Sequence, residues 1–91
     1  MKPSRSKEER AQDQIERGLA ADRLITDQVV IDWFAAERAR VTEEMISAPI
    51  EDDDKRRSAA LRLQALRDLH NHLTIEAALG RKQQERAKPH G

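Results

Sequence analysis

His70 and His72 are the side chains of this sequence best suited to chemistry, and with Asn71 between them they spell the letters of a nuclease motif. That motif is spread over tens of residues in a strand–strand–helix metal site, and this segment has no such frame. Successive residues of a helix turn by about 100°, so positions 70 and 72 point to nearly opposite sides and cannot share a metal ion on a regular helix. We interpret His70 as a side chain at the edge of an apolar core.

Four consecutive acids, Glu51 to Asp54, form a second group that resembles a cation site. A calcium-binding loop spaces its ligands and needs a glycine at its turn, and this run has neither feature. Acids in the first turn of a helix are favoured by the helix dipole alone. We interpret these residues as the start of a helix.

Catalysis is not expected from the remaining polar residues. Glu43 and Glu44 lack the spacing of a di-metal carboxylate site, because neither has a histidine three positions further on, and we expect both to be solvated. The serines have no strained turn or nearby base, and the isolated glycines cannot form a phosphate-binding loop. We therefore predict a non-enzymatic protein with no cofactor, no metal and no small-molecule substrate.

The spacing of caps and apolar residues predicts three helices and no strand. Ser6 and Glu9 form a capping box before a first helix over about 7–24. Apolar residues at helical spacing predict a second helix over about 27–47 and a third over about 53–79 or beyond. The short connection between them makes them antiparallel neighbours. The predicted fold is therefore an all-α antiparallel hairpin with an additional N-terminal helix.

A glycine and a proline lie near the predicted ends of the third helix and of the domain. Gly80 is placed to end the third helix as a left-handed cap, and the alternative is a helix that passes through Gly80 and frays near Pro89. The predicted organisation is a flexible basic N-terminus over 1–6, a single helical domain over 7–79 and a basic C-terminal tail over 80–91.

The composition indicates a chain that needs a partner. Charged residues make up 37% of it and net to zero, and much of its apolar content is alanine, so a lone hairpin buries little. We expect self-association or docking on a larger protein, with Phe34 packed inside and Trp33 at the edge of the seam or toward a partner. The candidate interface residues are Val30, Trp33, Phe34, Val41, Met45, Leu63, Leu66, Leu69 and Leu73.

The sequence has no cysteine, no apolar run of membrane-spanning length and no signal-peptide core, so we expect no disulfides, no membrane partner and no secretion by a signal peptide. Charge is uneven along it: residues 1–10 carry net +2, residues 80–91 net +3 and the body between them net −5. The basic ends are able to hold phosphates, although the acidic body repels a nucleic-acid backbone.

The order of these features resembles short all-helical proteins encoded among the structural and packaging genes of tailed bacteriophages. The segments that carry the resemblance are Ala20–Asp27, Ala48–Asp54, Leu61–Leu69 and Gly80 with Arg81 and Lys82. The resemblance implies a multi-copy virion component that binds a larger protein ring or shell, found in the virion or in the bacterial cytoplasm during assembly. It carries over no functional residue.

The alternative is a DNA-packaging recognition subunit of the small-terminase type, which also forms helical oligomers. Its helix-turn-helix needs a recognition helix with polar base-contacting residues, and the segment after the break at 24–27 opens with Gln28, Val29, Val30 and Ile31, which suits this poorly. We favour the structural hypothesis, and a regulatory or chaperone-like hairpin dimer is a third. In the alternative, the DNA contacts are Arg5, Lys7, Arg10, Arg81, Lys82, Arg86 and Lys88.

Overall fold

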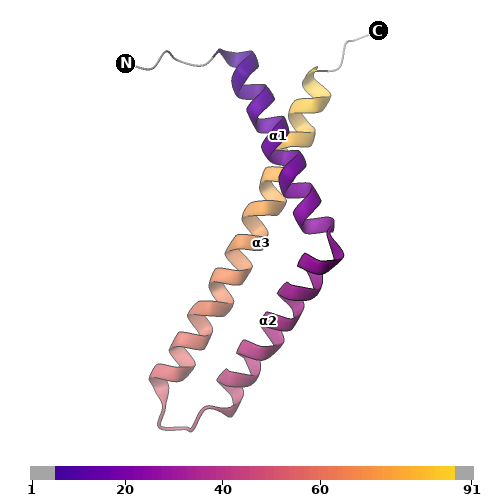
Figure 1. Cartoon of the computed structure of the whole chain (residues 1–91). Coiled ribbons are helices and arrows are strands. Elements are labelled where there is room, and N and C mark those ends of the chain that lie inside the picture. The colour runs from indigo at the N-terminus through magenta and orange to yellow at the C-terminus, as the bar shows by residue number, and fades with distance from the viewer. Residues whose placement is uncertain (1–5, 88–91) are drawn as a thin grey trace. The chain divides into compact units, whose positions relative to one another are not determined.

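The structure, a computed structural model, describes residues 6–87, and every secondary-structure element in that range is an α-helix (Figure 1). Helix α1 spans Lys7–Thr26, α2 spans Gln28–Ser47 and α3 spans Asp53–Ala87. The predicted all-α class is confirmed, and so is the hairpin of the second and third helices with an additional helix before it.

Polar caps set the starts of the first two helices. Ser6 Oγ accepts a hydrogen bond from Glu9 N at 3.2 Å, as the capping box predicts for α1. Asp27 alone separates α1 from α2, and its backbone is extended, with φ −74° and ψ 124°. Its Oδ1 accepts from Val29 N at 2.8 Å and from Val30 N at 3.4 Å, which satisfies amides that otherwise have no partner at a helix start.

The acidic turn between α2 and α3 is a helix start, as the sequence indicates. Ala48 is extended before Pro49, because the proline ring disfavours helical angles in the preceding residue. Asp52 Oδ1 accepts from Lys55 N at 3.0 Å and so caps α3. Arg56 pairs with Asp53 and also donates to the Pro49 carbonyl, which ties the first turn of α3 to the loop.

Of the two predicted ends of the third helix, the left-handed cap at Gly80 is wrong, and the helix that passes through Gly80 is confirmed. Helix α3 continues to Ala87, and Gly80 does not have the positive φ of a left-handed cap. Residues 80–87 of the predicted tail are thus helical, whereas residues 88–91 lie outside the described residues. The helix continues because Gly80 packs against another helix, as described below, which offsets its low helix propensity.

The chain divides into two compact units. Unit 1 combines residues up to Ile25 with residues from His72 onward, so it holds most of α1 and the C-terminal part of α3. Unit 2 is Thr26–Asn71, which holds α2, the turn and the N-terminal part of α3.

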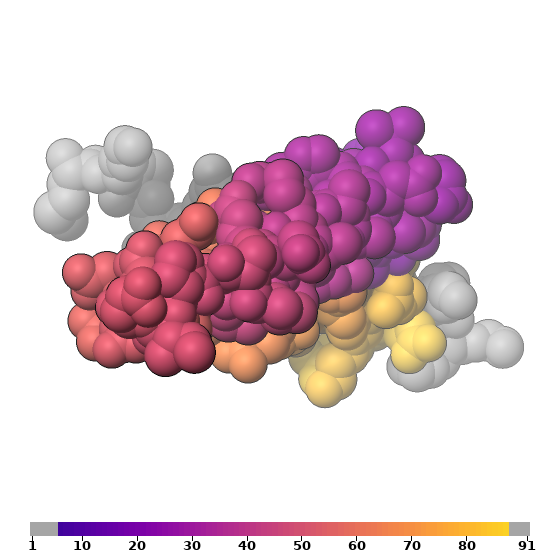
Figure 2. Space-filling model, turned by 90° about the horizontal axis from the view of Figure 1, so that it is seen from below, coloured from indigo at the N-terminus to yellow at the C-terminus, as the bar shows by residue number. Residues whose placement is uncertain are grey.

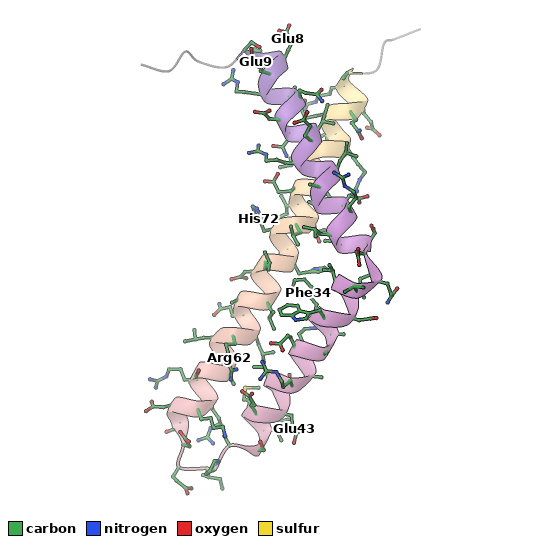
Figure 3. All side chains as sticks on the ribbon, viewed as in Figure 1. Glu8, Glu9, Phe34, Glu43, Arg62 and His72 are labelled. Carbon is green, nitrogen blue, oxygen red and sulfur yellow. The ribbon has the colours of Figure 1, made fainter. Side chains whose placement is uncertain are left out.

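Unit 2 is the antiparallel hairpin, and its buried residues are Phe34, Val41, Ala48 and Ala59. Phe34 points from α2 toward α3 (Figure 3), where its ring meets His70 edge to face, with centroids 5.8 Å apart. His70 is thus a neighbour of the apolar core, as predicted. At the closed end of the hairpin, the turn and the adjoining helix ends form a continuous surface (Figure 2).

Unit 1 is a close crossing of α1 over α3. The residues buried there are the small ones, Gly18 and Ala21 of α1 with Ala77 and Gly80 of α3. A Cβ placed on Gly18 would lie 2.5 Å from Gly80 Cα, so the two backbones are in direct contact.

Polar pairs flank this crossing. Gln14 Nε2 donates to Glu76 Oε2 at 2.9 Å, and Arg81 Nη1 donates to Asp22 Oδ1 at 3.0 Å. Each pair joins α1 to α3, so the two helices of unit 1 are held both by backbone contact and by side-chain hydrogen bonds.

Candidate functional site

Large apolar side chains lie mostly on the surface in the described part of the chain. The buried hydrophobic residues number six, and four of them are alanines; only Phe34 and Val41 are larger. Exposed apolar side chains in this number identify the surface on which a candidate binding site is to be sought. The exposed large hydrophobic residues are Leu19, Leu24, Val29, Ile31, Trp33, Ile46, Ile50, Leu61, Leu69, Ile75 and Leu79.

Unit 2 has a shallow apolar groove between its two helices, which we call the hairpin groove. Its volume is about 270 Å³. The side chain of Val41 is 1% exposed beneath it, whereas Leu69 is 48% exposed beside it. The full lining is Glu37, Val41, Arg62, Ala65, Leu66 and Leu69.

Trp33 stands one helical turn before Glu37 and is 52% exposed. Its ring contacts the buried Phe34 edge to face, with centroids 5.4 Å apart and an interplanar angle of 84°. An aromatic ring that rests on a buried neighbour is held in place, so little side-chain freedom remains to be lost when a partner covers it. The prediction that Phe34 packs inside and Trp33 does not is confirmed.

On the other side of the groove, Leu61, Ala65 and Leu69 form a ridge along α3, because residues four apart lie one above another on a helix. Leu61 is 59% exposed, Leu69 is 48% exposed, and Ala65 between them is also exposed. The ridge is therefore an apolar strip with its smallest member in the middle, and a packing helix approaches closely at such a point.

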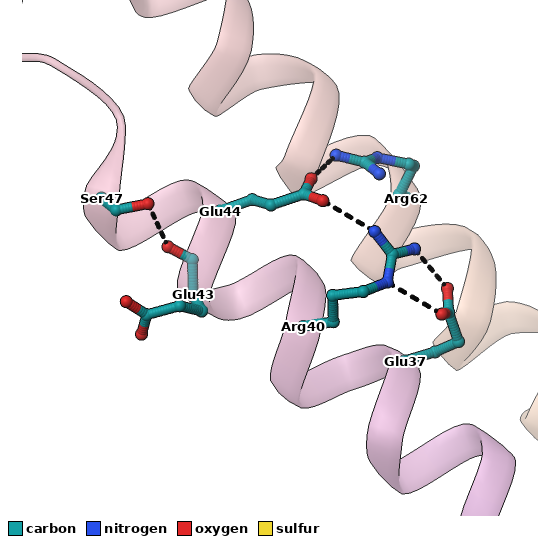
Figure 4. Close-up of polar contacts among 6 residues, drawn as sticks. All are labelled: Glu37, Arg40, Glu43, Glu44, Ser47 and Arg62. Carbon is teal, nitrogen blue, oxygen red and sulfur yellow. Dashed lines mark hydrogen bonds and ion pairs between the residues drawn. The ribbon is translucent and has the colours of Figure 1, made fainter.

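Four charged side chains are linked to one another by hydrogen bonds, in a group that we call the charge ladder: Glu37, Arg40, Glu44 and Arg62 (Figure 4). Glu37 and Arg62 of this group line the groove. Arg40 donates through Nε and Nη2 to the two carboxylate oxygens of Glu37, at 3.0 and 2.8 Å, and through Nη1 to Glu44 Oε1 at 2.7 Å. Glu44 Oε2 accepts from Arg62 of α3. The ladder thus links the two helices of the hairpin.

The ladder shifts the proton affinities of its members. The hydrogen bond from Arg40 lowers the pKa of Glu37 below its ordinary value, and the hydrogen bond from Arg62 lowers the pKa of Glu44. The bond to Glu37 in turn raises the pKa of Arg40. All four side chains remain partly exposed, so the ladder is accessible to another molecule.

The predicted interface residues differ in how far they are exposed to solvent. Phe34 and Val41 are buried, and only Trp33 and Leu69 are exposed enough to meet a partner directly. The remaining five are half-buried, and Leu66 among them lines the hairpin groove: Val30, Met45, Leu63, Leu66 and Leu73.

Sequence reasoning missed the ladder. Glu44 was expected to be solvated, but it is half-buried and bonded to two arginines, while Glu43 is exposed as expected. The spacing of Glu37, Arg40 and Glu44 is the signal available in the sequence, since residues three and four apart are neighbours on a helix. Arg62 has no such local signal.

A second hollow, of about 670 Å³, lies in unit 1 between α1 and the end of α3. Lys7, Arg10 and Arg17 of α1 line it together with Arg86 of α3, so the fold gathers four cations there, with Asp13 as a neighbour of opposite sign. Of the predicted DNA contacts, this brings together Lys7, Arg10 and Arg86.

The remaining predicted DNA contacts lie elsewhere. Arg81 is paired with Asp22, which offsets its charge, and Lys82 is exposed. Arg5 and Lys88 lie outside the described residues. Arg17, by contrast, belongs to the hollow although the sequence did not single it out.

The described residues contain no group of three or more His, Cys, Asp or Glu side chains arranged to hold a metal ion. In the acidic turn, Asp52 caps α3 and Asp53 pairs with Arg56, so these carboxylates have structural partners. None of the helices in residues 6–87 combines the length and apolarity needed to cross a bilayer.

No protein-family model matches this sequence, and neither a curated protein nor a solved structure matches it.

Proposed function

We propose that this chain is a non-enzymatic helical assembly subunit, a multi-copy component of a tailed-phage virion that binds a larger protein ring or shell. It acts by covering apolar surface on its neighbours with apolar surface of its own. The phage setting follows from the resemblance in the order of sequence features, and the mode of action follows from the surface of unit 2.

The observation that carries the proposal is that more of the large hydrophobic side chains are exposed than buried. Eleven large hydrophobic side chains are exposed among the described residues, whereas two are buried. Each large side chain covered by a partner contributes about 1.5–3 kcal/mol before the costs of association. Docking that covers such a surface is therefore favoured in free energy over leaving it exposed to water.

The hairpin groove is the best-formed part of that surface. Its lining combines the exposed Leu69 and the partly exposed Arg62 with a buried floor at Val41, and the exposed Trp33 stands one helical turn before Glu37 of the same lining. Tryptophan and arginine are the residue types that dominate binding energy at protein interfaces. Trp33, Leu69 and Arg62 are therefore the side chains that carry docking in this proposal.

Light scattering on the purified chain, with and without duplex DNA at low and moderate salt, tests the class of function. We expect an oligomer whose mass is indifferent to DNA. Mass spectrometry of purified virions then tests the setting, and we expect the chain at a fixed ratio to the major capsid protein. A salt-sensitive complex with DNA would contradict the proposal.

The second candidate is the DNA-packaging recognition subunit, and the basic hollow of unit 1 favours it. Four cations from two helices around one hollow provide a local positive field that the zero net charge of the chain conceals. Each phosphate that these side chains neutralise releases counterions, so binding weakens steeply with salt.

Arg10→Glu together with Arg86→Glu tests this candidate. We expect the variant to lose DNA binding if the hollow holds a phosphate backbone, with the slope of log affinity against log salt reduced by about two. Arg38→Glu with Arg57→Glu, on unit 2, is the matched control with the same change in net charge.

A further inference from the structure

We infer that the chain forms a domain-swapped dimer, in which α1 and α2 become one continuous helix and α1 packs on α3 of a second copy. The inference rests on the proposed function in that an assembly subunit needs contacts between copies, and it names the surface that makes them. Domain swapping replaces a contact within one chain by the same contact between two identical chains, so it is a low-cost route to a dimer.

The junction between α1 and α2 is a single residue, Asp27, and residues 24–30 contain no glycine or proline that would require a break. The break is held by the Asp27 side chain, which accepts hydrogen bonds from Val29 N and Val30 N. In a continuous helix the same amides donate to the carbonyl groups four residues earlier. The two forms therefore satisfy these amides in different ways, and Asp27 selects between them.

A continuous helix turns the buried face of α1 away from the hairpin. Helix α1 buries Gly18 and Ala21, and α2 buries Phe34 and Val41. At about 100° per residue, each member of the first pair would lie about 140–160° around one helix from each member of the second. A straight continuous helix therefore cannot present both faces to one copy of α3, and the break at residue 27 is what allows α1 and α2 of one chain to share it.

This mismatch releases α1 from the α3 helix of its own chain. In a continuous helix, the side of α1 that shares a face with Phe34 carries Glu16 and Arg23, which lie about 140–160° around from Gly18. Long charged side chains cannot make the backbone contact that Gly18 makes with Gly80. Both the small-residue face of α1 and that of residues 72–87 then lack a partner.

A second copy supplies a fitting surface for each of these two faces. The Cβ position of Gly18 lies 2.5 Å from Gly80 Cα, so the contact needs small residues on both helices. The hydrogen bond from Arg81 to Asp22 beside it pairs opposite charges. One chain carries both halves of this contact. Two copies therefore exchange α1 reciprocally about a two-fold axis and keep the contacts of unit 1.

The first test compares variants at the junction by light scattering and analytical ultracentrifugation over a dilution series. Asp27→Ala removes the cap that holds the break, so we expect the dissociation constant of the dimer to fall by about tenfold or more. Gln28→Pro should raise it by about 100-fold or more, because proline is tolerated at the first residue of α2 but not inside a continuous helix. Asp27 is already extended, as the residue before a proline prefers to be.

Gln28→Ala is the matched control for the proline variant. Both changes remove the side-chain hydrogen bond from Gln28 to Asp32 at 2.8 Å, but only proline excludes a continuous helix. We expect this control to dimerise like wild type. Circular dichroism of the monomeric proline variant should show wild-type helicity, which excludes unfolding as the cause of its lost dimer.

The second test asks which copy supplies α1. Asp22→Arg places two cations together in unit 1, because Arg81 donates to this position, and Arg81→Asp places two carboxylates together. When the two variants are mixed in equal amounts and equilibrated, exchange of α1 pairs opposite charges at both crossings of the heterodimer. A dimer without exchange keeps like charges within each chain. We expect native mass spectrometry to show the heterodimer above the half share that random mixing gives.

The outcomes separate this inference from the proposed function. A chain that is monomeric at every concentration, in wild type and Asp27→Ala alike, overturns the inference. A dimer that Gln28→Pro leaves intact, or a mixture with the random share of heterodimer, also overturns it, because the copies then meet without exchanging α1. In these last two cases an oligomer that ignores DNA still supports the assembly function, whereas a salt-sensitive complex with DNA contradicts that function whatever the junction variants show.

Discussion

Gly18 of α1 and Gly80 of α3 lie so close together that a Cβ atom on either one would fall within 2.7 Å of the Cα atom of the other. The same Cβ on Gly18 would lie 2.9 Å from the Glu76 carbonyl oxygen, and one on Gly80 would lie 3.2 Å from the Gln14 carbonyl oxygen. The atoms in the way belong to backbone and have no freedom to rotate aside. A side chain at either position therefore forces the two helix backbones apart.

Gly18→Ala should destabilise unit 1, against the trend set by helix propensity. In an exposed helix the same change stabilises by about 1 kcal/mol. Here the added methyl group must push the two helices apart, and overpacking of this kind costs about 1–3 kcal/mol. Urea denaturation followed by circular dichroism at 222 nm measures the difference, and Gly80→Ala should behave alike.

Ala20→Gly is the matched control for these glycines, because Ala20 is an exposed residue of α1. It should lose about 1 kcal/mol through propensity alone. If Gly18→Ala were instead more stable than wild type, the helices would not cross at Gly18.

Phe34→Ala and Trp33→Ala form a matched pair of adjacent aromatic truncations. Phe34 is 5% exposed and Trp33 is 52% exposed. We expect Phe34→Ala to lower the free energy of unfolding by about 3–5 kcal/mol, since it leaves a cavity between α2 and α3. Trp33→Ala should cost about 1 kcal/mol or less, measured by thermal denaturation at concentrations that keep the chain monomeric. Equal losses would mean that Trp33 is part of the core.

Acid should weaken the hairpin through its charge ladder. The pKa values of Glu37 and Glu44 are lowered in the folded chain, so their contribution to stability is fully present above the ordinary glutamate value of 4.5. It is lost as the pH falls through the folded-state values below 4.5, because protonation removes the bonds from Arg40 and Arg62. Melting temperatures of wild type and of Glu37→Gln with Glu44→Gln should therefore converge on acidification and differ most near neutral pH. A constant difference across that range would show that these carboxylates do not contribute through their charge.

Removal of residues 81–91 should destabilise unit 1. Truncation after Gly80 deletes the last turns of α3 and the hydrogen bond from Arg81 to Asp22 at 3.0 Å. It also places a new chain end beside the glycine contact, where the helix frays. Removal of residues 88–91 alone leaves α3 whole and should keep the melting temperature of the full chain. If both truncations melted alike, residues 81–87 would add nothing to the packing of α1 on α3.

The local rules of helix formation were enough to predict the three helices. Ser6, Asp27 and Asp52 cap helix starts through bonds to amides two or three residues away, and Pro49 acts on the residue before it. Each of these effects is contained in a few neighbouring residues, so a reader of the sequence is able to place it. The hairpin follows in the same way from the shortness of its connection.

At Gly80 these local rules give the wrong result. A glycine followed by Arg81 and Lys82 is a good helix end by every local criterion, yet α3 runs through it to Ala87. The tertiary contact with Gly18 reverses the local preference, because a position without a side chain is what lets two backbones touch. The buried residues of α1 are Gly18 and Ala21, which lie at this contact, whereas Leu19 is 46% exposed.

The sequence by itself determined the all-α class, the helix starts, and the burial of Phe34 beside the exposure of Trp33. These features depend on residue spacing and on neighbours along the chain. The tertiary structure decided which residues far apart in sequence come together: Gly18 contacts Gly80, Glu44 bonds to Arg62, and Lys7 and Arg10 line one hollow with Arg86. The reason is physical. Helix periodicity specifies which side chains share a face, but the partner of that face depends on the rotation and crossing of two helices, and those emerge only when both surfaces pack together.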